Sequence, residues 1–185
     1  MAIIVGMHFA TLFLILQYYQ EVLGFNPLLA GLAYLPLTAV VFTVSNFVPG
    51  LVAKFGVRTL LITGCIFVAA SLIGFSRLTD TSTYLADVLL PLFLHSTGVA
   101  MVFIPGSIVI LEDVDDLDAG IMSGVLQISQ QIGGAVGLAA ILSIYTANLL
   151  PHNFSSGFNN AFLAGAGISV LAAIITIFTI KRKSH

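Results

Sequence analysis

Three glutamines lie in a segment of this sequence whose other side chains are apolar or small. Gln127, Gln130 and Gln131 belong to the stretch SGVLQISQQIGGAVG at 123–137. Each side-chain amide carries two hydrogen-bond donors and an acceptor, and leaving these groups unpaired in hydrocarbon would cost several kcal/mol. The helix that carries them must therefore turn them toward another helix or toward water.

The helical period sorts this segment into two faces. Steps of three and four residues place the small and polar side chains together on one broad face, made of Gly120, Ser123, Gly124, Gln127, Gln130, Gln131 and Gly134. The opposite face suits lipid, and it consists of Ile121, Val125, Ile128, Ile132 and Val136. For Gln127 and Gln131 two interpretations stay open: hydrogen bonding between packed helices, worth about 0.6 kcal/mol each, or the wall of a water-filled cavity. For Gly133, Gly134 and Gly137 close helix packing is favoured.

His8 and His95 are ionisable side chains deep inside apolar runs. An ionisable group buried in a membrane is a candidate functional group, and histidine changes its charge near physiological pH. The alternative for each is a structural histidine bonded to a backbone carbonyl or a hydroxyl. Pro91 leaves the carbonyl of Asp87 without its helical donor, so we expect the helix that carries His95 to bend.

The composition indicates an integral membrane protein. Of the 185 residues, 58% are hydrophobic and only 8% are charged, and the mean hydropathy is +1.09, whereas about a quarter of a soluble domain is charged. The single cysteine, Cys65, allows no internal disulfide. We find no basic arm for nucleic acid, no nucleophile triad, no metal-ligand cluster and no nucleotide motif, and so predict neither an enzyme nor a cofactor or metal site.

Six apolar runs are long enough to cross a bilayer, which takes about 20 residues in a helix. They predict an all-α, single six-span bundle with spans at roughly 2–19, 28–52, 58–76, 85–111, 119–149 and 160–180. These runs are continuous and too long for the alternating strands of a membrane β-barrel. Asn26 followed by Pro27 predicts one helix start, and Asp118 is expected to cap the fifth span.

The basic residues predict the orientation of the bundle. If the first span runs outward, Arg77 lies outside, and five basic residues lie on the cytoplasmic side: Lys54, Arg58, Lys181, Arg182 and Lys183. We therefore expect a multi-pass protein of the plasma membrane with a cytoplasmic C-terminus. Because the first apolar run starts at Met1 without a polar flank, we also expect the chain to be the C-terminal part of a longer protein.

Three stretches of the sequence resemble a known family. They are YYQEVLGFNPLLAGLAYLP (18–36), LVAKFGVRTLL (51–61) and DAGIMSGVLQISQQIGGAVGLA (118–139). They resemble the C-terminal six-helix half of the major facilitator superfamily, and most closely its fourteen-span drug/proton antiporters, the EmrB/QacA-like multidrug exporters. The resemblance implies one bundle of a secondary transporter that exports small amphipathic or lipophilic compounds by proton-coupled alternating access.

The stretch 51–61 resembles the cytoplasmic signature of that superfamily, written G-x-L-A-D-R-x-G-R-K/R-x-x-L. The positions that match are Leu51, Lys54, Gly56, Arg58 and Leu61. Pro49 stands in place of the first glycine, and Ala53 in place of the aspartate. In the family that aspartate helps to latch the cytoplasmic side, so we predict a turn here without a latch.

The resemblance also suggests where a substrate would bind, because in the family the helix that contains the glutamines borders the central pathway. Our candidates for the cavity are His8, Thr11, Tyr18, His95, Gln127 and Gln131. The expected partners are the lipid bilayer, a small-molecule substrate, and either the missing N-terminal half or a second half-transporter chain. The alternatives are a non-transporting truncated product, an accessory half that needs a partner chain and, more weakly, a channel.

Overall fold

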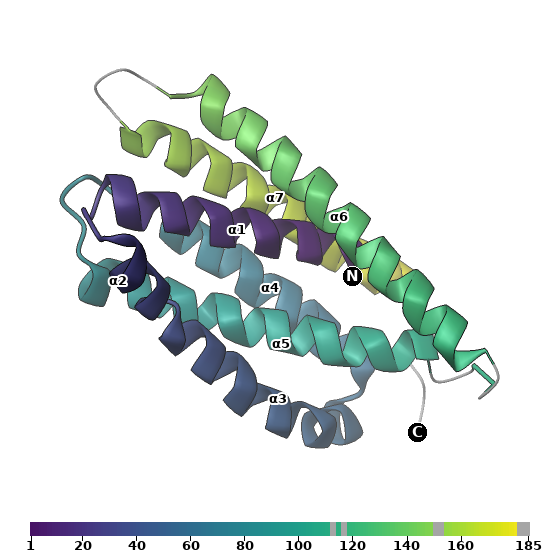
Figure 1. The fold of residues 1–185 in the computed structure, drawn as a ribbon. Helices are drawn as coiled ribbons and strands as arrows, with labels where there is room; N and C mark the ends of the chain where they lie inside the picture. Colours follow the sequence, from purple (N-terminus) through teal and green to yellow (C-terminus); the bar gives the residue numbers. More distant parts are fainter. Residues whose placement is uncertain (112–113, 116–117, 150–153, 181–185) are drawn as a thin grey trace.

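The computed structural model describes residues 1–111, 114–115, 118–149 and 154–180, and within them all regular structure is helical (Figure 1). The elements are α1 (Ala2–Glu21), α2 (Pro27–Leu32), α3 (Leu35–Phe55), α4 (Val57–Phe75), η1 (Tyr84–Val88), α5 (Leu89–Leu111), α6 (Ala119–Ala147) and α7 (Phe154–Thr179). In these residues six helical segments are long and apolar enough to cross a membrane. The predicted all-α fold with six spans is confirmed; residues 181–183, which we used for the orientation, lie outside the described residues.

The second span is interrupted, although we predicted a continuous helix. Helix α2 ends at Leu32 and α3 begins at Leu35. Pro36 has no N–H to donate to the carbonyl of Leu32, four residues earlier, and its ring crowds that carbonyl. The hydroxyl of Tyr34, between the two helices, donates to the carbonyl of Leu12 in α1. This bond holds the interruption against α1.

The fourth span begins with an irregular turn just before Pro91; the bend that we expected in this helix stays a prediction. The five residues of η1 form a π-helical turn that leads into α5. Such a turn is found where the regular i→i−4 ladder is disturbed. Asp87 lies in this turn, and its carboxylate accepts a hydrogen bond from the backbone N–H of Thr83 at 2.7 Å.

The two predicted caps behave differently. The side chain of Asn26 accepts from the N–H of Leu29 at 2.8 Å and Pro27 follows it, so this cap is confirmed. Asp118 does precede α6, but its side chain makes no capping hydrogen bond, so that part of the prediction is wrong. The backbone explains the difference, because a capping residue is normally extended: Asn26 has ψ 162°, whereas Asp118 has ψ −8°.

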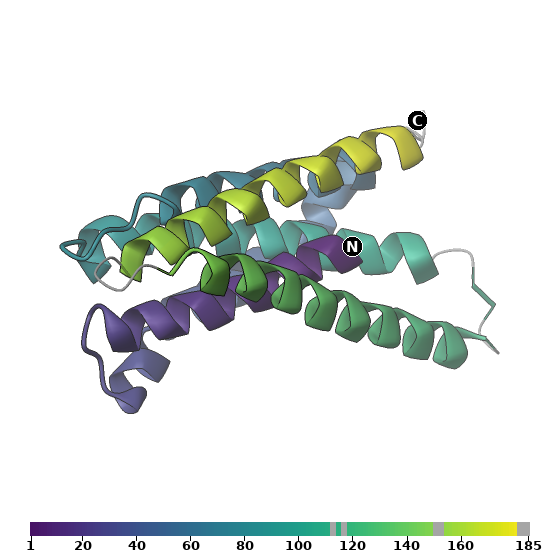
Figure 2. The ribbon, with the colours of Figure 1, turned by 90° about the horizontal axis from the view of Figure 1, so that it is seen from above.

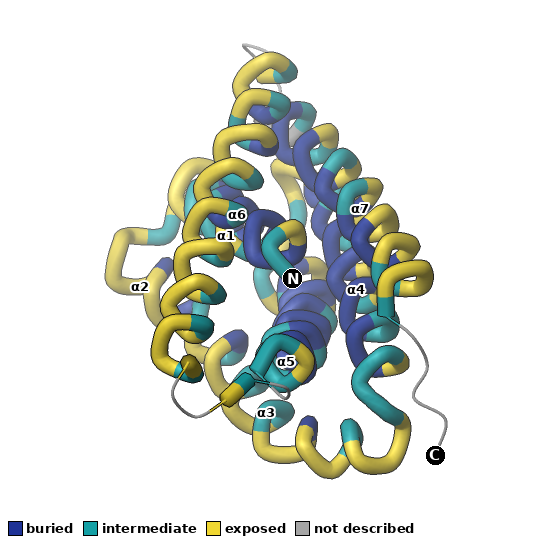
Figure 3. The backbone as a smooth tube through the Cα atoms, turned by 90° about the vertical axis from the view of Figure 1, so that its right-hand side faces the viewer, coloured by how far each residue is buried: buried dark blue, intermediate teal, exposed yellow. Residues whose placement is uncertain are grey.

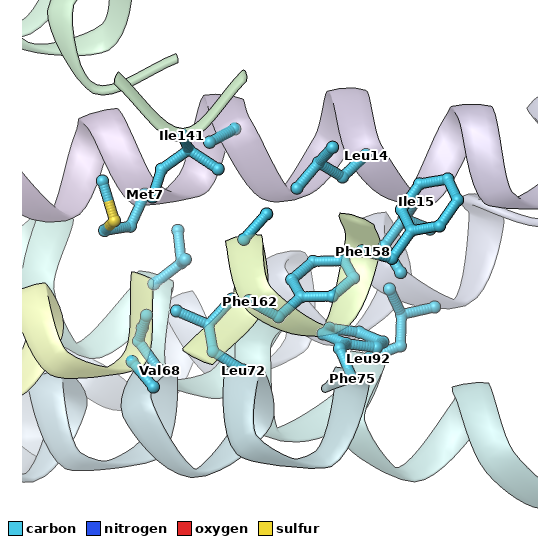
Figure 4. Packing of buried hydrophobic residues seen from close by; sticks show 14 of the residues in the cluster. Met7, Leu14, Ile15, Val68, Leu72, Phe75, Leu92, Ile141, Phe158 and Phe162 are labelled. Atoms are coloured by element: carbon cyan, nitrogen blue, oxygen red, sulfur yellow. The ribbon is translucent and has the colours of Figure 1, made fainter. Parts of the chain in front are cut away.

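The helices form two groups of three. Helices α1, α6 and α7 pack together, and so do α3, α4 and α5, and the groups join where α4 packs along α7 (Figures 1 and 2). Figure 4 shows side chains from α1, α4, α5, α6 and α7 meeting in the core between the groups. The rings of Phe75 and Phe162, for example, lie 5.4 Å apart. This core fixes the spacing of the helices that surround the site described below.

Helices α1 and α6 cross in close contact at glycines. A Cβ on Gly6 would lie 2.6 Å from the carbonyl oxygen of Gly133 and 3.0 Å from the Cα of Gly137. Gly133 and Gly137 are four residues apart on α6, the spacing that lets helix backbones approach closely in membranes. The Cβ of a residue at Gly134 would lie 2.8 Å from the ring of Phe9. The predicted packing role of these α6 glycines is confirmed.

Two spans remain largely uncovered by the rest of the bundle. Only 11% of the α6 span and 17% of the α2–α3 span are buried, against 56% of α1. Figure 3 shows the exposed residues running along α6 and α3. The face of α6 that we assigned to lipid is exposed along its length: the exposed fraction is 70% for its first residue, Ile121, and 64% for its last, Val136. The two least covered spans are thus the ones that supply α3 and α6 to the wall of the cavity described below.

Candidate functional site

A cavity of about 720 Å³ lies between α1, α3, α5 and α6. This volume falls within the range of drug-sized ligand sites. It is lined by Val5, His8, Phe9, Leu37, Thr38, Val41, Phe42, Ser45, Val99, Ala100, Phe103, Ile104, Gln127, Gln130 and Gln131. The first group of helices contributes α1 and α6 to the wall, and the second contributes α3 and α5.

The wall is mainly apolar and carries no formal charge among its described residues. Aliphatic side chains and three phenylalanines supply most of it. The polar groups are the imidazole of His8, the hydroxyls of Thr38 and Ser45, and the three amides of α6. Apolar walls bury hydrocarbon, and a few placed polar groups orient a ligand. The arrangement therefore suits an amphipathic small molecule rather than an ion.

The three glutamines lie on this wall. Gln127 and Gln131 are exposed to the cavity, and within the described part of the chain their amides have no hydrogen-bond partner. The amide nitrogen of Gln130 lies 3.8 Å from the sulfur of Met1. The described helices thus leave the amides of Gln127 and Gln131 free to contact whatever fills the cavity.

His8 and His95 lie side by side although they are 87 residues apart. Nδ1 of His8 is 3.1 Å from Nε2 of His95, and Nδ1 of His95 is 3.2 Å from the hydroxyl of Ser71 on α4. Ser71 in turn donates to the carbonyl of Val68 at 2.7 Å. His8 is half-buried on the cavity wall, whereas His95 and Ser71 are completely buried behind it. A row of polar groups therefore runs from the cavity into the core.

Three of the predicted cavity residues do not line the cavity. Thr11 is buried and donates its hydroxyl to the carbonyl of Met7 at 2.7 Å. Tyr18 lies about 15 Å further along α1 than His8, and its hydroxyl donates to the carbonyl of Thr79 at 2.7 Å. His95 contacts the cavity only through His8. His8, Gln127 and Gln131 are the predicted residues that the structure brings to the wall.

Helix α3 contributes residues to the cavity wall that we did not predict. Thr38, Val41, Phe42 and Ser45 all line the cavity. Their spacing of three, four and seven residues is that of one helix face, so a search for mixed polar and apolar faces in the second span could have found them. The small hydroxyls of Thr38 and Ser45 mark such a face less clearly than the larger amides of α6 do.

The signature loop forms the predicted turn. Gly56 has φ 78°, a value that favours glycine, and it both ends α3 and precedes α4. Arg58 donates to the carbonyl of Ile177 near the end of α7 at 2.7 Å, and the ammonium of Lys54 lies 5.2 Å from the ring of Phe55. Leu61 is buried, whereas Leu51 is half-buried. The matching residues thus close one end of the bundle, away from the cavity wall.

Comparison with known proteins identifies the family. The family model described as Major Facilitator Superfamily matches residues 1–138. The chain belongs to the major facilitator superfamily. This membership, with the six apolar helices, makes it an integral membrane protein of a transporter family rather than an enzyme.

Several curated proteins of known name are similar to this major facilitator chain. It is 33% identical over 163 residues to the cephamycin export protein CmcT of Amycolatopsis lactamdurans, which covers 86% of the chain and 33% of the relative. It is 32% identical over 167 residues to the tetracenomycin C resistance and export protein of Streptomyces glaucescens, covering 88% of the chain and 30% of the relative. The puromycin resistance protein pur8 of Streptomyces alboniger is 30% identical over 167 residues, covering 88% of the chain and 31% of the relative. The chain spans about a third of the length of these relatives.

Proposed function

We propose that this chain forms the C-terminal half of a fourteen-span, EmrB/QacA-like drug/proton antiporter. It exports small amphipathic or lipophilic compounds from the cell by proton-coupled alternating access, in the plasma membrane and with its C-terminus in the cytoplasm. The observation that carries this proposal is the uncharged, amide-bearing cavity of about 720 Å³ between α1, α3, α5 and α6. The names of the relatives, which include export of and resistance to antibiotics, support the direction of transport and the class of substrate.

The chemistry of the wall indicates how such a compound would be held. Phe9, Phe42 and Phe103 offer flat apolar surfaces for rings. The amides of Gln127 and Gln131 can both donate and accept hydrogen bonds, so they can bind polar groups of either kind. A wall of this composition accepts many shapes of compound, as a multidrug exporter requires.

The second half of the transporter would cover α3 and α6. These are the spans that the bundle itself leaves most exposed. Lipid can cover the apolar face of α6, but it offers no partner for the amides of Gln127 and Gln131. We therefore propose that an N-terminal half, or a second half-transporter chain, packs across these helices and closes the cavity.

Transport with a narrowed cavity tests this proposal. The complete gene that encodes the chain is expressed in bacteria whose own multidrug exporters have been deleted, and the efflux of ethidium is measured. Val41→Phe places a ring inside the cavity, and Val125→Phe places the same ring on the exposed face of α6. We expect efflux from the unaltered protein, a loss of several-fold with Val41→Phe, and little change with Val125→Phe.

The outcomes also separate the alternatives. Equal efflux from the two variants would show that this cavity is not the substrate site. No efflux of ethidium, puromycin or tetracenomycin from protein that is present in the membrane would refute the transport proposal. That result would favour a non-transporting product or an accessory half. A flux that does not saturate with concentration would indicate a channel.

A further inference from the structure

We propose that Nε2 of His8 binds either one proton or a hydrogen-bond donor of the substrate, and never both at once. The inference deepens the proposed transport function and rests on it for its physiological meaning. It starts from the order of hydrogen bonds in the row from Val68 to His8. The donor of each hydrogen bond in this row can be assigned, because the group at one end can accept a hydrogen bond but cannot donate one.

The fixed end is the carbonyl of Val68, which can only accept. The hydroxyl of Ser71 has a single hydrogen and lies 2.7 Å from this carbonyl, closer than the 3.2 Å to Nδ1 of His95. Ser71 therefore donates to Val68, and its oxygen is left to accept from His95. It follows that Nδ1 of His95 carries a hydrogen and that Nε2 of neutral His95 is an acceptor.

The hydrogen on His8 follows from the acceptor on His95. Nε2 of His95, as an acceptor, takes its hydrogen bond from Nδ1 of His8 at 3.1 Å. The two rings are inclined by only 17°, and their centroids are 5.3 Å apart. The distance between the centroids is longer than the distance between the two nitrogens by about one ring radius on each side. The two nitrogens therefore lie between the rings, which meet edge to edge, as an N–H···N bond requires. In neutral His8 the hydrogen is on Nδ1, and Nε2 carries a free lone pair.

This lone pair is available from the cavity. His8 belongs to the cavity wall, and no residue in the described parts of the chain supplies a partner for its Nε2. A hydroxyl or amine of a substrate can donate to it. A hydronium ion that reaches the cavity can instead transfer its proton, which forms an N–H bond at Nε2, leaves water and converts the ring to imidazolium. The added hydrogen removes the acceptor, so the two events exclude each other.

The row takes up one proton and passes none onward. After protonation of His8, its Nδ1 hydrogen still donates to His95, and the charge can be shared by a shift of that hydrogen across the 3.1 Å contact. A second proton on the pair would place two N–H groups against each other. The far end is the carbonyl of Val68, which accepts a hydrogen bond but releases no proton. The cavity is therefore both the entry and the exit of this proton.

The charged side chains of the described residues lie far from the pair. Along the helices that pack around it, Glu21 is about 20 Å from His8, Arg58 about 20 Å from Ser71, and Asp87 about 12 Å from His95. Nearer to the pair, the titratable groups are the thiol of Cys65 on α4 and the amino group of Met1. Lys54 lies in the last turn of α3. Among the described residues of α6 and α7 the one ionisable side chain is that of Tyr145, whose hydroxyl lies 3.5 Å from the carboxylate of Glu21 and so at the same distance along the bundle from the pair. A proton that enters the cavity thus meets the imidazole of His8 first.

Nitrogen NMR on histidine tests the assignment without any transport assay. The protein is labelled with ¹⁵N-histidine, reconstituted in lipid nanodiscs, and made with His152 and His185 replaced by glutamine, which leaves only His8 and His95 to be observed. We expect both rings to carry hydrogen on Nδ1 at alkaline pH, and the pair to gain a single proton as the pH falls. Hydrogen on Nε2 of either neutral ring, or two independent protonations, would overturn the proposal.

Two serines provide a matched pair of variants. Ser71→Ala removes the acceptor for His95 and should abolish the Nδ1–H form of that ring. Ser96 is equally buried and donates to the carbonyl of Leu92, outside the row. Ser96→Ala should leave the ¹⁵N spectrum and its titration unchanged. If Ser71→Ala also leaves them unchanged, Ser71 does not set the polarity and the proposal fails.

The dependence of ethidium efflux on pH links the site to transport. His8→Gln should alter this dependence, because the glutamine amide does not titrate. Efflux whose pH profile is the same in His8→Gln refutes this inference while the proposed function stands. A protein that shows the single-proton titration but exports nothing refutes the proposed function and leaves the proton site intact.

Discussion

A methyl group at the crossing of α1 and α6 should destabilise the bundle more than its size suggests. In Gly6→Ala the new Cβ would lie 2.6 Å from the carbonyl oxygen of Gly133, whereas ordinary van der Waals contact begins at 3.4 Å. The obstructing atoms are backbone on both sides, so no side chain can rotate away. The two helices must therefore separate by roughly 0.8 Å, the difference between those distances.

The cost of this separation can be estimated. Widening a packed contact by 0.5–1 Å loses about a quarter to a half of its dispersion energy, and overpacking a tight core costs about 1–3 kcal/mol. For a chain of this size each kcal/mol lowers the Tm by about 2–4 °C. We therefore expect the Tm of Gly6→Ala to fall by about 2–12 °C.

The protein carries its own reporter for this measurement. Cys65 is the single cysteine and is only 2% exposed, so a thiol-reactive maleimide dye labels it when the bundle opens on heating. Gly167→Ala is the matched control, because a Cβ there would meet nothing within 4 Å. If Gly6→Ala melts at the temperature of Gly167→Ala or above it, the close crossing of α1 and α6 does not exist in the membrane protein.

Three further predictions follow from the polar groups. Tyr19→Phe should raise the Tm, because the buried hydroxyl of Tyr19 has no hydrogen-bond partner within the described residues and such a hydroxyl costs about 1–3 kcal/mol. An unchanged or lower Tm would show that this hydroxyl is paired. Asn26→Ala should cost about 1 kcal/mol by the same melting assay, whereas Asp118→Ala should cost little because that side chain makes no capping bond; equal losses would contradict these cap geometries. In size-exclusion chromatography in mild detergent, the purified chain should elute as a dimer or a larger species, and replacing Gln127 and Gln131 with leucine should shift it toward the monomer. A stable wild-type monomer would show that these amides need no covering partner.

The spans could be predicted from the sequence because a bilayer imposes a length and a composition that are visible locally. The break between α2 and α3 was missed for a reason that is not local. Pro36 is compatible with a kinked continuous helix as well as with a new helix start. The hydroxyl of Tyr34 bonds to Leu12 in α1 and holds the broken form, and a contact between distant residues leaves no periodic signal in either segment.

The polar face of α6 could be predicted from the sequence, but its neighbours on the other helices could not. Its position on α6 and the packing role of the neighbouring glycines could be read from a period of 3.6 residues. The partner of those glycines, Gly6, lies in the first span and is marked by no pattern of its own. In the same way the polar face of α3 was missed, since hydroxyls as small as Thr38 and Ser45 do not stand out in an apolar run.

The two histidines, for which the sequence left the same alternatives open, differ in the structure. His95 is completely buried, where an unpaired polar group costs most, and both of its ring nitrogens are paired, one with Ser71 and one with His8. That complete satisfaction makes His95 an orienting residue. The half-buried His8 keeps one nitrogen free because the cavity can supply its partner, and it is therefore the histidine at which a ligand or a proton would act.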